Sequence, residues 1–174
     1  SIVSKRPQTT RTRIMGVLTD DNCQLVFMDT PGLLKPRNSL GDYMRKSVIS
    51  SLEGVDLCLL VVEADSELSK ADEELIDKFG NIKLKSILAI NKIDLLKDKA
   101  KLMSQIDKDS KAYNFEAIVP VSGRDGNGID LLVDELRRHA QPGGFLFPED
   151  TLTDQPERVI VSEIVREKLL RKLD

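Results

Sequence analysis

The apolar residues of this chain form short, nearly continuous runs that alternate with amphipathic stretches. Three such runs lie at residues 57–62, 86–90 and 117–121. Their length and their lack of polar alternation are typical of strands buried on both faces of a parallel sheet. Two further runs, at residues 14–20 and 24–29, are separated by a polar Asp-Asn pair and predict a hairpin with a tight turn.

Between these runs, apolar residues recur with the spacing of an α-helix. Ser69 followed by Asp72 resembles a capping box, and Gly80 is expected to end that helix after Phe79. Helices are predicted at residues 39–52, 70–79, 99–112 and 129–139.

Strands separated by helices of this length favour an α/β fold. The connections are then right-handed crossovers, and the sheet is open, doubly wound and mostly parallel, with helices on both faces. Ligands of such sheets bind at the carboxyl ends of the strands. We therefore expect the loops after Asp29, Ile90 and Val121 to share one rim.

The end of the chain has a different composition. Residues 141–157 are rich in Pro, Gly and Asp and are predicted to be a linker, which follows a main domain at residues 1–140. Beyond the linker, residues 158–174 have helical spacing, with Asp154 and Glu157 as a capping pair. We expect this helix to begin a second domain.

Composition narrows the class of protein. Hydrophobic residues make up 40% of the 174 residues, which argues against disorder, and the net charge of −3 does not indicate a nucleic-acid binder. Four basic residues within positions 1–13 fit either a solvated arm or a surface that faces phosphate or RNA. Cys23 and Cys58 each lie within an apolar run and are expected to be buried free thiols. No apolar stretch approaches the roughly 20 residues that a membrane-spanning helix needs.

The first motif with chemical meaning is Asp29-Thr30-Pro31-Gly32, directly after a predicted strand. An Asp at a strand end can hold Mg²⁺ through a water molecule, as in NTPases. Gly32 lets the backbone approach a γ-phosphate and change conformation when that phosphate leaves. The same four residues also occur in ordinary turns, so this motif alone leaves both interpretations open.

The second motif is Asn91-Lys92-Ile93-Asp94, again directly after a predicted strand. The Asp94 carboxylate can accept hydrogen bonds from the ring N–H and the amine of guanine together, whereas adenine offers no such pair. Asn91 can bond the purine edge and the neighbouring loop, and the stem of Lys92 can lie along the ring. This motif predicts a site that selects guanine.

Two weaker motifs complete the series. Ser122-Gly123 follows the next strand and is expected to brace Asp94 and to offer a backbone N–H to the guanine carbonyl. Thr9 and Thr10 precede the hairpin, and a threonine hydroxyl there can complete the Mg²⁺ shell when a γ-phosphate is present. Each motif alone also fits an unremarkable polar loop, but their order along the chain is that of a GTPase.

The phosphate-binding motif G-x-x-x-x-G-K-S/T does not occur in the 174 residues. Lys46-Ser47 is similar to its end, but Arg45 stands where the second glycine belongs. We therefore expect the phosphate-binding loop, with its strand and helix, to precede Ser1 and the fold to be incomplete at the N-terminus.

Taken together, these motifs identify the chain as similar to the Era family of bacterial GTPases, within the TrmE-Era class. The resemblance covers nearly all 174 residues and is most specific at residues 1–16, 27–33, 91–94 and 147–170. It implies the P-loop GTPase fold, and the last stretch implies a junction to a KH-type RNA-binding domain. It also implies hydrolysis of GTP to GDP as a switch in assembly of the small ribosomal subunit, with Mg²⁺ as the metal.

The resemblance also assigns roles to residues. It places Thr9 and Thr10 in switch I, residues 29–33 in switch II, residues 91–94 in the base motif and Ser122 in the last loop. Thr9, Thr10 and Gly32 are then the expected catalytic residues, and Thr10 and Asp29 (through water) hold the metal. The chain departs from the family at Gly123, where alanine is usual. Leu33 stands where many other GTPases have a water-positioning Gln, and that is normal for this class.

The partners that the resemblance implies are guanine nucleotide, small-subunit ribosomal RNA and the 30S subunit, the last two mainly through a domain beyond residue 174. It further implies a cytoplasmic protein with peripheral association at the inner face of the cell membrane. Two alternatives stay open: a non-catalytic interaction module, or another TrmE-Era GTPase that acts in tRNA modification or large-subunit assembly. The sequence does not indicate an oligomeric state.

Overall fold

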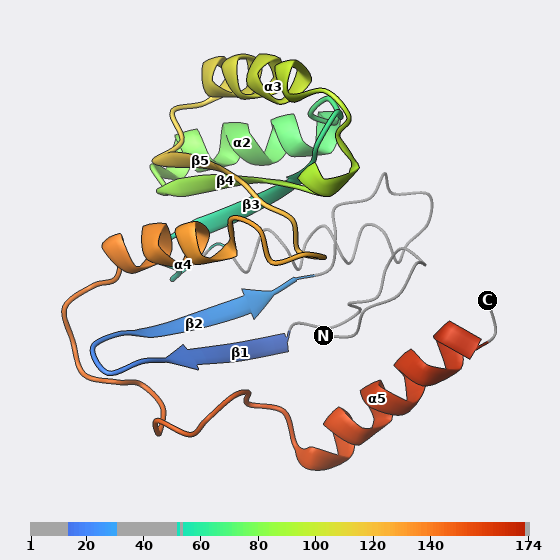
Figure 1. Cartoon of the computed structure of the whole chain (residues 1–174). Coiled ribbons are helices and arrows are strands. Elements are labelled where there is room, and N and C mark those ends of the chain that lie inside the picture. Colours follow the sequence, from blue (N-terminus) through green and yellow to red (C-terminus); the bar gives the residue numbers. More distant parts are fainter. Residues whose placement is uncertain (1–13, 31–51, 53, 173–174) are drawn as a thin grey trace. The chain divides into compact units, whose positions relative to one another are not determined.

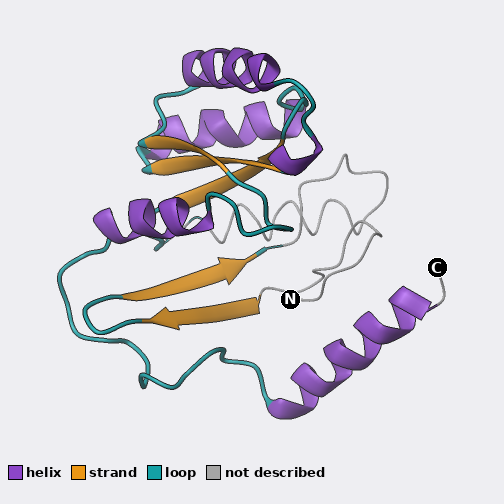
Figure 2. Cartoon of the chain, in the orientation of Figure 1, coloured by secondary structure: helices purple, strands orange, loops and turns teal. Residues whose placement is uncertain are grey.

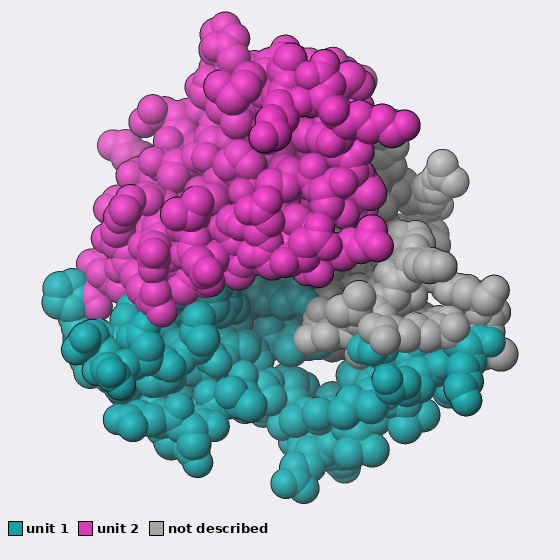
Figure 3. Space-filling view, viewed as in Figure 1, with its two compact units in different colours: residues 1–54, 142–174 teal, residues 55–141 magenta. Residues whose placement is uncertain are grey.

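The computed structural model describes residues 14–30, 52 and 54–172. The chain forms two compact units, one made of residues 1–54 and 142–174 and the other of residues 55–141 (Figure 3). Among the described residues, no helix has the length and apolar character needed to cross a membrane.

The unit of residues 55–141 is built on a parallel three-stranded sheet (Figures 1 and 2). Its strands are β3 (Cys58–Glu63), β4 (Ser86–Asn91) and β5 (Ala117–Pro120), in the order β3-β4-β5. The three apolar runs predicted as parallel strands are therefore confirmed. The central strand β4 is the core of this unit, and its residues Ile87, Leu88 and Ile90 are fully buried.

Helices cover both faces of this sheet. These are α2 (Lys70–Ile82), α3 (Lys99–Ala112) and α4 (Ile129–Arg138). Figure 1 shows α2 and α3 on one face and α4 on the other, as the doubly wound prediction requires. The predicted range of residues 99–112 agrees with α3 at both ends, and that of residues 129–139 is one residue longer than α4.

The start of α2 was predicted correctly and its end was not. The Ser69 N–H donates to Asp72 Oδ2 (2.8 Å) and the Asp72 N–H to Ser69 Oγ (3.2 Å), which is the capping box. Gly80 does not end the helix, which continues to Ile82. Lys83 takes the left-handed conformation (φ 53°) and, with the next residue, closes a Schellman motif by donating to the carbonyls of Gly80 and Phe79.

That helix end is fixed by tertiary packing. The Leu84 N–H donates to the Phe79 carbonyl (2.9 Å), and both side chains are buried. A Schellman motif is commonly stabilised by an apolar contact between these two positions. Burial of Phe79 and Leu84 therefore outweighs the cost of one helical glycine, about 1 kcal/mol.

The other unit contains the predicted hairpin. Strands β1 (Ile14–Thr19) and β2 (Gln24–Asp29) are antiparallel, and Ile14 pairs with Asp29 at the open end. At the turn, Asp20 Oδ1 accepts hydrogen bonds from the backbone N–H groups of Asn22 (3.1 Å) and Cys23 (2.8 Å). A short acidic side chain that bonds its own backbone is a standard reason for a tight turn.

The C-terminal part of the same unit ends in α5 (Glu157–Lys172). The predicted helix at residues 158–174 is thus observed up to residue 172, whereas the start of a new domain there stays a prediction, as does the Asp154–Glu157 cap. Cys23 and Cys58 are free, as expected, but partly rather than fully buried, and burial raises the pKa of Cys58 to about 11. The predicted helix at residues 39–52 lies almost wholly outside the described residues, and the basic segment of residues 1–13 lies wholly outside them.

Candidate functional site

The carboxyl ends of the three parallel strands bring the base motif and the last loop together. Register pairs Glu63 at the end of β3 with Asn91 at the end of β4. The Val121 N–H donates to the Ile90 carbonyl (2.8 Å), so the loops after β4 and β5 leave the sheet side by side. The predicted rim is confirmed for these two loops. Asp29 belongs to the other unit, and its place on the same rim stays a prediction.

Asn91 ties the two loops together. Its Oδ1 accepts hydrogen bonds from the backbone N–H groups of Lys92 (2.7 Å) and Gly123 (2.9 Å). The predicted bond from Asn91 to the neighbouring loop is thus present. Because Oδ1 is used in this way, the side-chain NH₂ of Asn91 is the group that can donate to a ligand.

Lys92 forms the turn between β4 and the short segment that carries Asp94. Its backbone is left-handed (φ 64°), and residues 93–95 continue as a short 3-10 helix, η1 (Ile93–Leu95). The Lys92 ammonium forms an ion pair with the Glu63 carboxylate, and both side chains are about half exposed. The aliphatic stem of Lys92 is therefore anchored at both ends, at its backbone and at Glu63.

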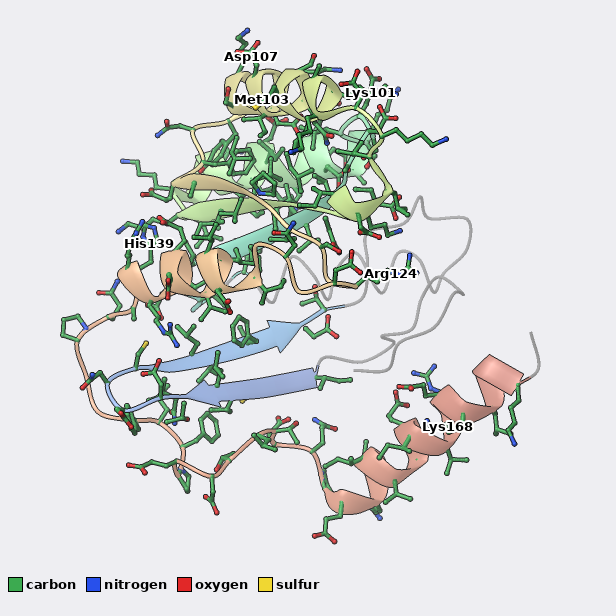
Figure 4. The ribbon with its side chains drawn as sticks, viewed as in Figure 1. Lys101, Met103, Asp107, Arg124, His139 and Lys168 are labelled. Atoms are coloured by element: carbon green, nitrogen blue, oxygen red, sulfur yellow. The ribbon has the colours of Figure 1, made fainter. Side chains whose placement is uncertain are left out.

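Asp94 carries the carboxylate of the motif, and its side chain is enclosed, at 11% exposed. Its Oδ1 accepts a hydrogen bond from Ser122 Oγ (2.9 Å), and Ser122 is itself buried. The Arg124 guanidinium lies 3.7 Å from Oδ2, a distance at which the charges attract without a hydrogen bond. Ser122 therefore fixes the carboxylate while Oδ2 keeps its capacity to accept donors from a ligand. Figure 4 shows Arg124 on the loop between β5 and α4.

The loop after β5 depends on a glycine that the sequence analysis did not single out. Gly128, immediately before α4, has φ 76°, and a Cβ there would lie 2.3 Å from the Pro120 carbonyl oxygen. The loop itself is closed by Ser122, whose N–H donates to the Asn127 carbonyl (2.8 Å) and whose carbonyl accepts from Gly126 (2.9 Å). The Gly-Asn-Gly sequence at residues 126–128 was the available signal for this tight turn.

The Ser122-Gly123 loop lies close to Asn91. The Gly123 N–H donates to Asn91 Oδ1 (2.9 Å). The predicted contact between a backbone N–H of this loop and the guanine carbonyl stays a prediction. Ser122 carries the bracing of Asp94 that was predicted for the pair. The motif search missed Glu63 and Arg124. Glu63 is brought beside Asn91 by the register of β3 and β4, and Arg124 reaches Asp94 from the loop after β5.

The predicted phosphate and metal residues lie partly outside the described residues. Asp29 ends β2 with an exposed side chain, and Thr30 follows it. An exposed carboxylate at a strand end suits a hard cation such as Mg²⁺, which prefers oxygen ligands and retains water. Five predicted site residues lie outside the described part of the chain: Thr9, Thr10, Pro31, Gly32 and Leu33.

Comparison with known proteins defines the class. A family model described as "50S ribosome-binding GTPase" matches residues 1–92, more than half of the chain. The chain therefore belongs to this GTPase family.

Within the family, the resemblance to Era is confirmed. The chain is 44% identical over its whole length to GTPase Era of Ruminiclostridium cellulolyticum and spans 58% of that protein. A crystal structure of Era with MgGDPNP and nucleotides 1506–1542 of 16S ribosomal RNA matches 97% of this chain, with a TM-score of 0.88 and 37% identity. A variant of Aquifex aeolicus Era bound to GDP and AlF₄⁻ matches 97% of it, with a TM-score of 0.87 and 36% identity.

These matches establish the P-loop GTPase fold that was predicted. The chain spans 57% of each of the two Era chains, as it spans little more than half of the curated relative. The ligands of those structures, MgGDPNP in one and GDP with AlF₄⁻ in the other, agree with the predicted nucleotide and Mg²⁺.

Proposed function

We propose that the full-length protein binds GTP and GDP with Mg²⁺ and hydrolyses GTP, as a switch in assembly of the small ribosomal subunit. The observation that carries this proposal is the Asp94 carboxylate, which is held by Ser122 and almost enclosed at the carboxyl edge of a parallel sheet. Ligands of doubly wound sheets bind at this edge.

Base selection follows from the hydrogen-bonding groups at this site. Two acceptor oxygens on Asp94 match the ring N–H and the exocyclic amine of guanine. Adenine lacks that pair of donors and would leave the enclosed Asp94 carboxylate without its ligand hydrogen bonds, at a cost of about 1–3 kcal/mol for each unsatisfied group. The NH₂ of Asn91 can donate to the purine edge, and the stem of Lys92, held by Glu63, can cover one face of the ring.

Hydrolysis is assigned to the other motif residues. Asp29 would hold Mg²⁺ through a water molecule, and Thr10 would complete the metal shell when a γ-phosphate is present; Thr9 and Gly32 are the other residues assigned to catalysis. Bound Mg²⁺ neutralises the negative charge that develops on the phosphates. Leu33 cannot position the attacking water, so we expect slow turnover unless another group or a partner supplies that function.

The proposed RNA partner is small-subunit ribosomal RNA. Support comes from the Era structure, which holds a segment of 16S ribosomal RNA and matches this chain at 37% identity. We propose that most of the RNA affinity lies in a KH-type domain after residue 174, and that the protein is cytoplasmic with peripheral membrane association. The family description names the 50S subunit, so a role on the large subunit is the competing candidate.

The test uses the full-length protein in two measurements. The first is GTP hydrolysis with Mg²⁺ and with EDTA, for which we expect turnover only with Mg²⁺. The second is filter binding to 30S and 50S subunits in the presence of GDP or a GTP analogue, for which we expect the 30S subunit to be preferred with the analogue. Absence of Mg²⁺-dependent turnover would leave the non-catalytic alternative, and preference for the 50S subunit would favour the competing candidate.

A further inference from the structure

The segment that leads to α5 is bound along the hairpin. We call residues 146–153 the strap. Val17 on β1 donates its N–H to the Leu152 carbonyl (2.9 Å), and Gly16 and Thr153 form an antiparallel bridge. Among the described residues, β1 pairs with β2 in the sheet of this unit, and the strap bonds the backbone of β1 at Val17 and Gly16. A partner along the edge of a strand contributes to the order of that strand.

Gln24, the first residue of β2, holds one end of the strap with its side-chain amide. Its Oε1 accepts hydrogen bonds from the backbone N–H groups of Leu146 (2.8 Å) and Phe147 (2.9 Å). Its Nε2 donates to the Phe147 carbonyl (3.0 Å) and to Thr19 Oγ1 (2.9 Å). Both lone pairs and both protons of the amide are therefore used, which fixes its orientation.

Thr153 holds the other end of the strap. Its Oγ1 donates to the Met15 carbonyl (2.6 Å) and accepts from the Gln155 N–H (3.3 Å). Met15 is adjacent to Ile14, which pairs with Asp29 at the open end of the hairpin. The strap thus runs from the hairpin turn, at Gln24, to the end that carries the predicted metal residue.

The hairpin is the segment that joins the two predicted switch motifs. Thr9 and Thr10 precede β1, and Asp29 begins the D-T-P-G motif at the end of β2. Since the strap bonds the open end of the hairpin through Thr153, it restrains the strand end that carries Asp29, which is expected to hold Mg²⁺ through water.

We propose that Gln24 and Thr153 are positioning residues for GTP hydrolysis, which act by keeping the strap bound along β1. This inference rests on the proposed function. Coupling is reciprocal, so a nucleotide that orders the open end of the hairpin should also tighten the strap. The structure thereby assigns a role in the nucleotide cycle to two residues outside the GTPase motifs.

The test compares four variants of the full-length protein. Gln24→Ala removes the amide, Thr153→Val removes the hydroxyl at similar volume, and Thr153→Ser restores it. Gln155→Ala is the control, because that side chain bonds Asp154 and makes no described bond to the hairpin. We expect Thr153→Val, which loses its one hydrogen bond to the hairpin, to lower kcat by about three- to tenfold, and Gln24→Ala, which loses four hydrogen bonds, to lower it by at least as much. KM should stay within about twofold, because the base site is unchanged.

Hydrogen exchange supplies a second readout that requires no variant. In the wild type, the backbone N–H groups of Val17, Leu146 and Phe147 should exchange more slowly with a GTP analogue than with GDP. Equal protection with the GTP analogue and with GDP would overturn the inference. It would also be overturned by a Gln24→Ala protein whose strap exchanges faster than in the wild type but whose kcat is unchanged. If the wild type itself shows no Mg²⁺-dependent turnover, the proposed function fails first, and the inference falls with it.

Discussion

Replacing Asp94 by Asn tests the base site at its centre. The two side chains have the same shape, and the amide oxygen can still accept the hydrogen bond that Ser122 Oγ makes at 2.9 Å. The change replaces Oδ2, the oxygen nearer Arg124, with an NH₂ group. In the full-length protein, that NH₂ would face a donor of guanine, whereas xanthine presents a carbonyl at the position of the guanine amine.

The expected magnitude follows from the enclosure of this side chain, which is 11% exposed. When the new NH₂ group faces a guanine N–H donor, neither group has an acceptor, and each unsatisfied group costs about 1–3 kcal/mol. Affinity for GTP should therefore fall by roughly 5- to 150-fold. Affinity for XTP should rise, because the new NH₂ can donate to the xanthine carbonyl. Asp94→Glu should weaken both nucleotides, since its longer side chain displaces the carboxylate.

The assay is a competition titration of a fluorescent guanine nucleotide with GTP, ATP and XTP. Asp125→Asn is the matched control, because Asp125 lies in the neighbouring loop after β5, its side chain is 57% exposed, and it lies 4.0 Å from Arg124. This control should keep the wild-type order of affinities. An Asp94→Asn protein that still prefers GTP to XTP would refute the reasoning and show that Asp94 does not contact the base.

Three further predictions concern stability and loop geometry. Urea denaturation measures the free energy of unfolding of each variant, and a GTP titration measures its affinity. Gly128→Ala should lower the free energy of unfolding by more than about 1 kcal/mol, because its Cβ would lie 2.3 Å from the Pro120 oxygen at a positive φ. Gly123→Ala should be tolerated or gain about 0.4–1 kcal/mol, because its Cβ would meet Asn91 at an ordinary 3.5 Å, and wild-type GTP affinity is expected. Burial raises the pKa of Asp109, whose Oδ2 lacks a hydrogen-bond partner among the described residues. The wild type should therefore lose stability as pH rises from the ordinary carboxyl pKa through the raised one, and Asp109→Asn should remove that loss. A destabilised Gly123→Ala protein, a Gly128→Ala protein as stable as the wild type, or an Asp109→Asn protein with an unchanged pH dependence would contradict the respective prediction.

The sequence predicted those parts of the fold that local patterns determine. The buried strands follow from short continuous apolar runs, and α3 follows from helical spacing. The hairpin was predicted from its polar Asp21-Asn22 pair, and the Asp20 side chain holds that turn through the backbone N–H groups of Asn22 and Cys23. The end of α2 could not be found in this way. The helix continues past Gly80 because Phe79 and Leu84 are buried. Such packing is a tertiary effect and cannot be predicted from a glycine in the local sequence.

In the candidate site, too, local motifs could be predicted from the sequence and long-range contacts could not. The motif residues Asn91 and Asp94 were found because their spacing after a strand is characteristic. Glu63 was missed because it reaches Lys92 from the end of β3, and only the register of the sheet brings it there. Arg124 was missed because it reaches Asp94 from the loop after β5, which lies beside the loop after β4.

The strap was missed for a related reason. Residues 146–153 have the composition of a linker, and nothing local in them indicates a bond to Gln24, more than a hundred positions earlier. Long-range hydrogen bonds to backbone carry no sequence signature, because any residue can provide the N–H or the carbonyl group.

The most direct test of the central claim is a crystal structure of the full-length protein with Mg²⁺ and GDP. The account predicts that both nitrogen donors of the guanine edge lie within about 2.7–3.2 Å of the Asp94 carboxylate, with Ser122 still bonded to it. Guanine bound at another site, or bound at this edge with its donors directed away from Asp94, would contradict the account.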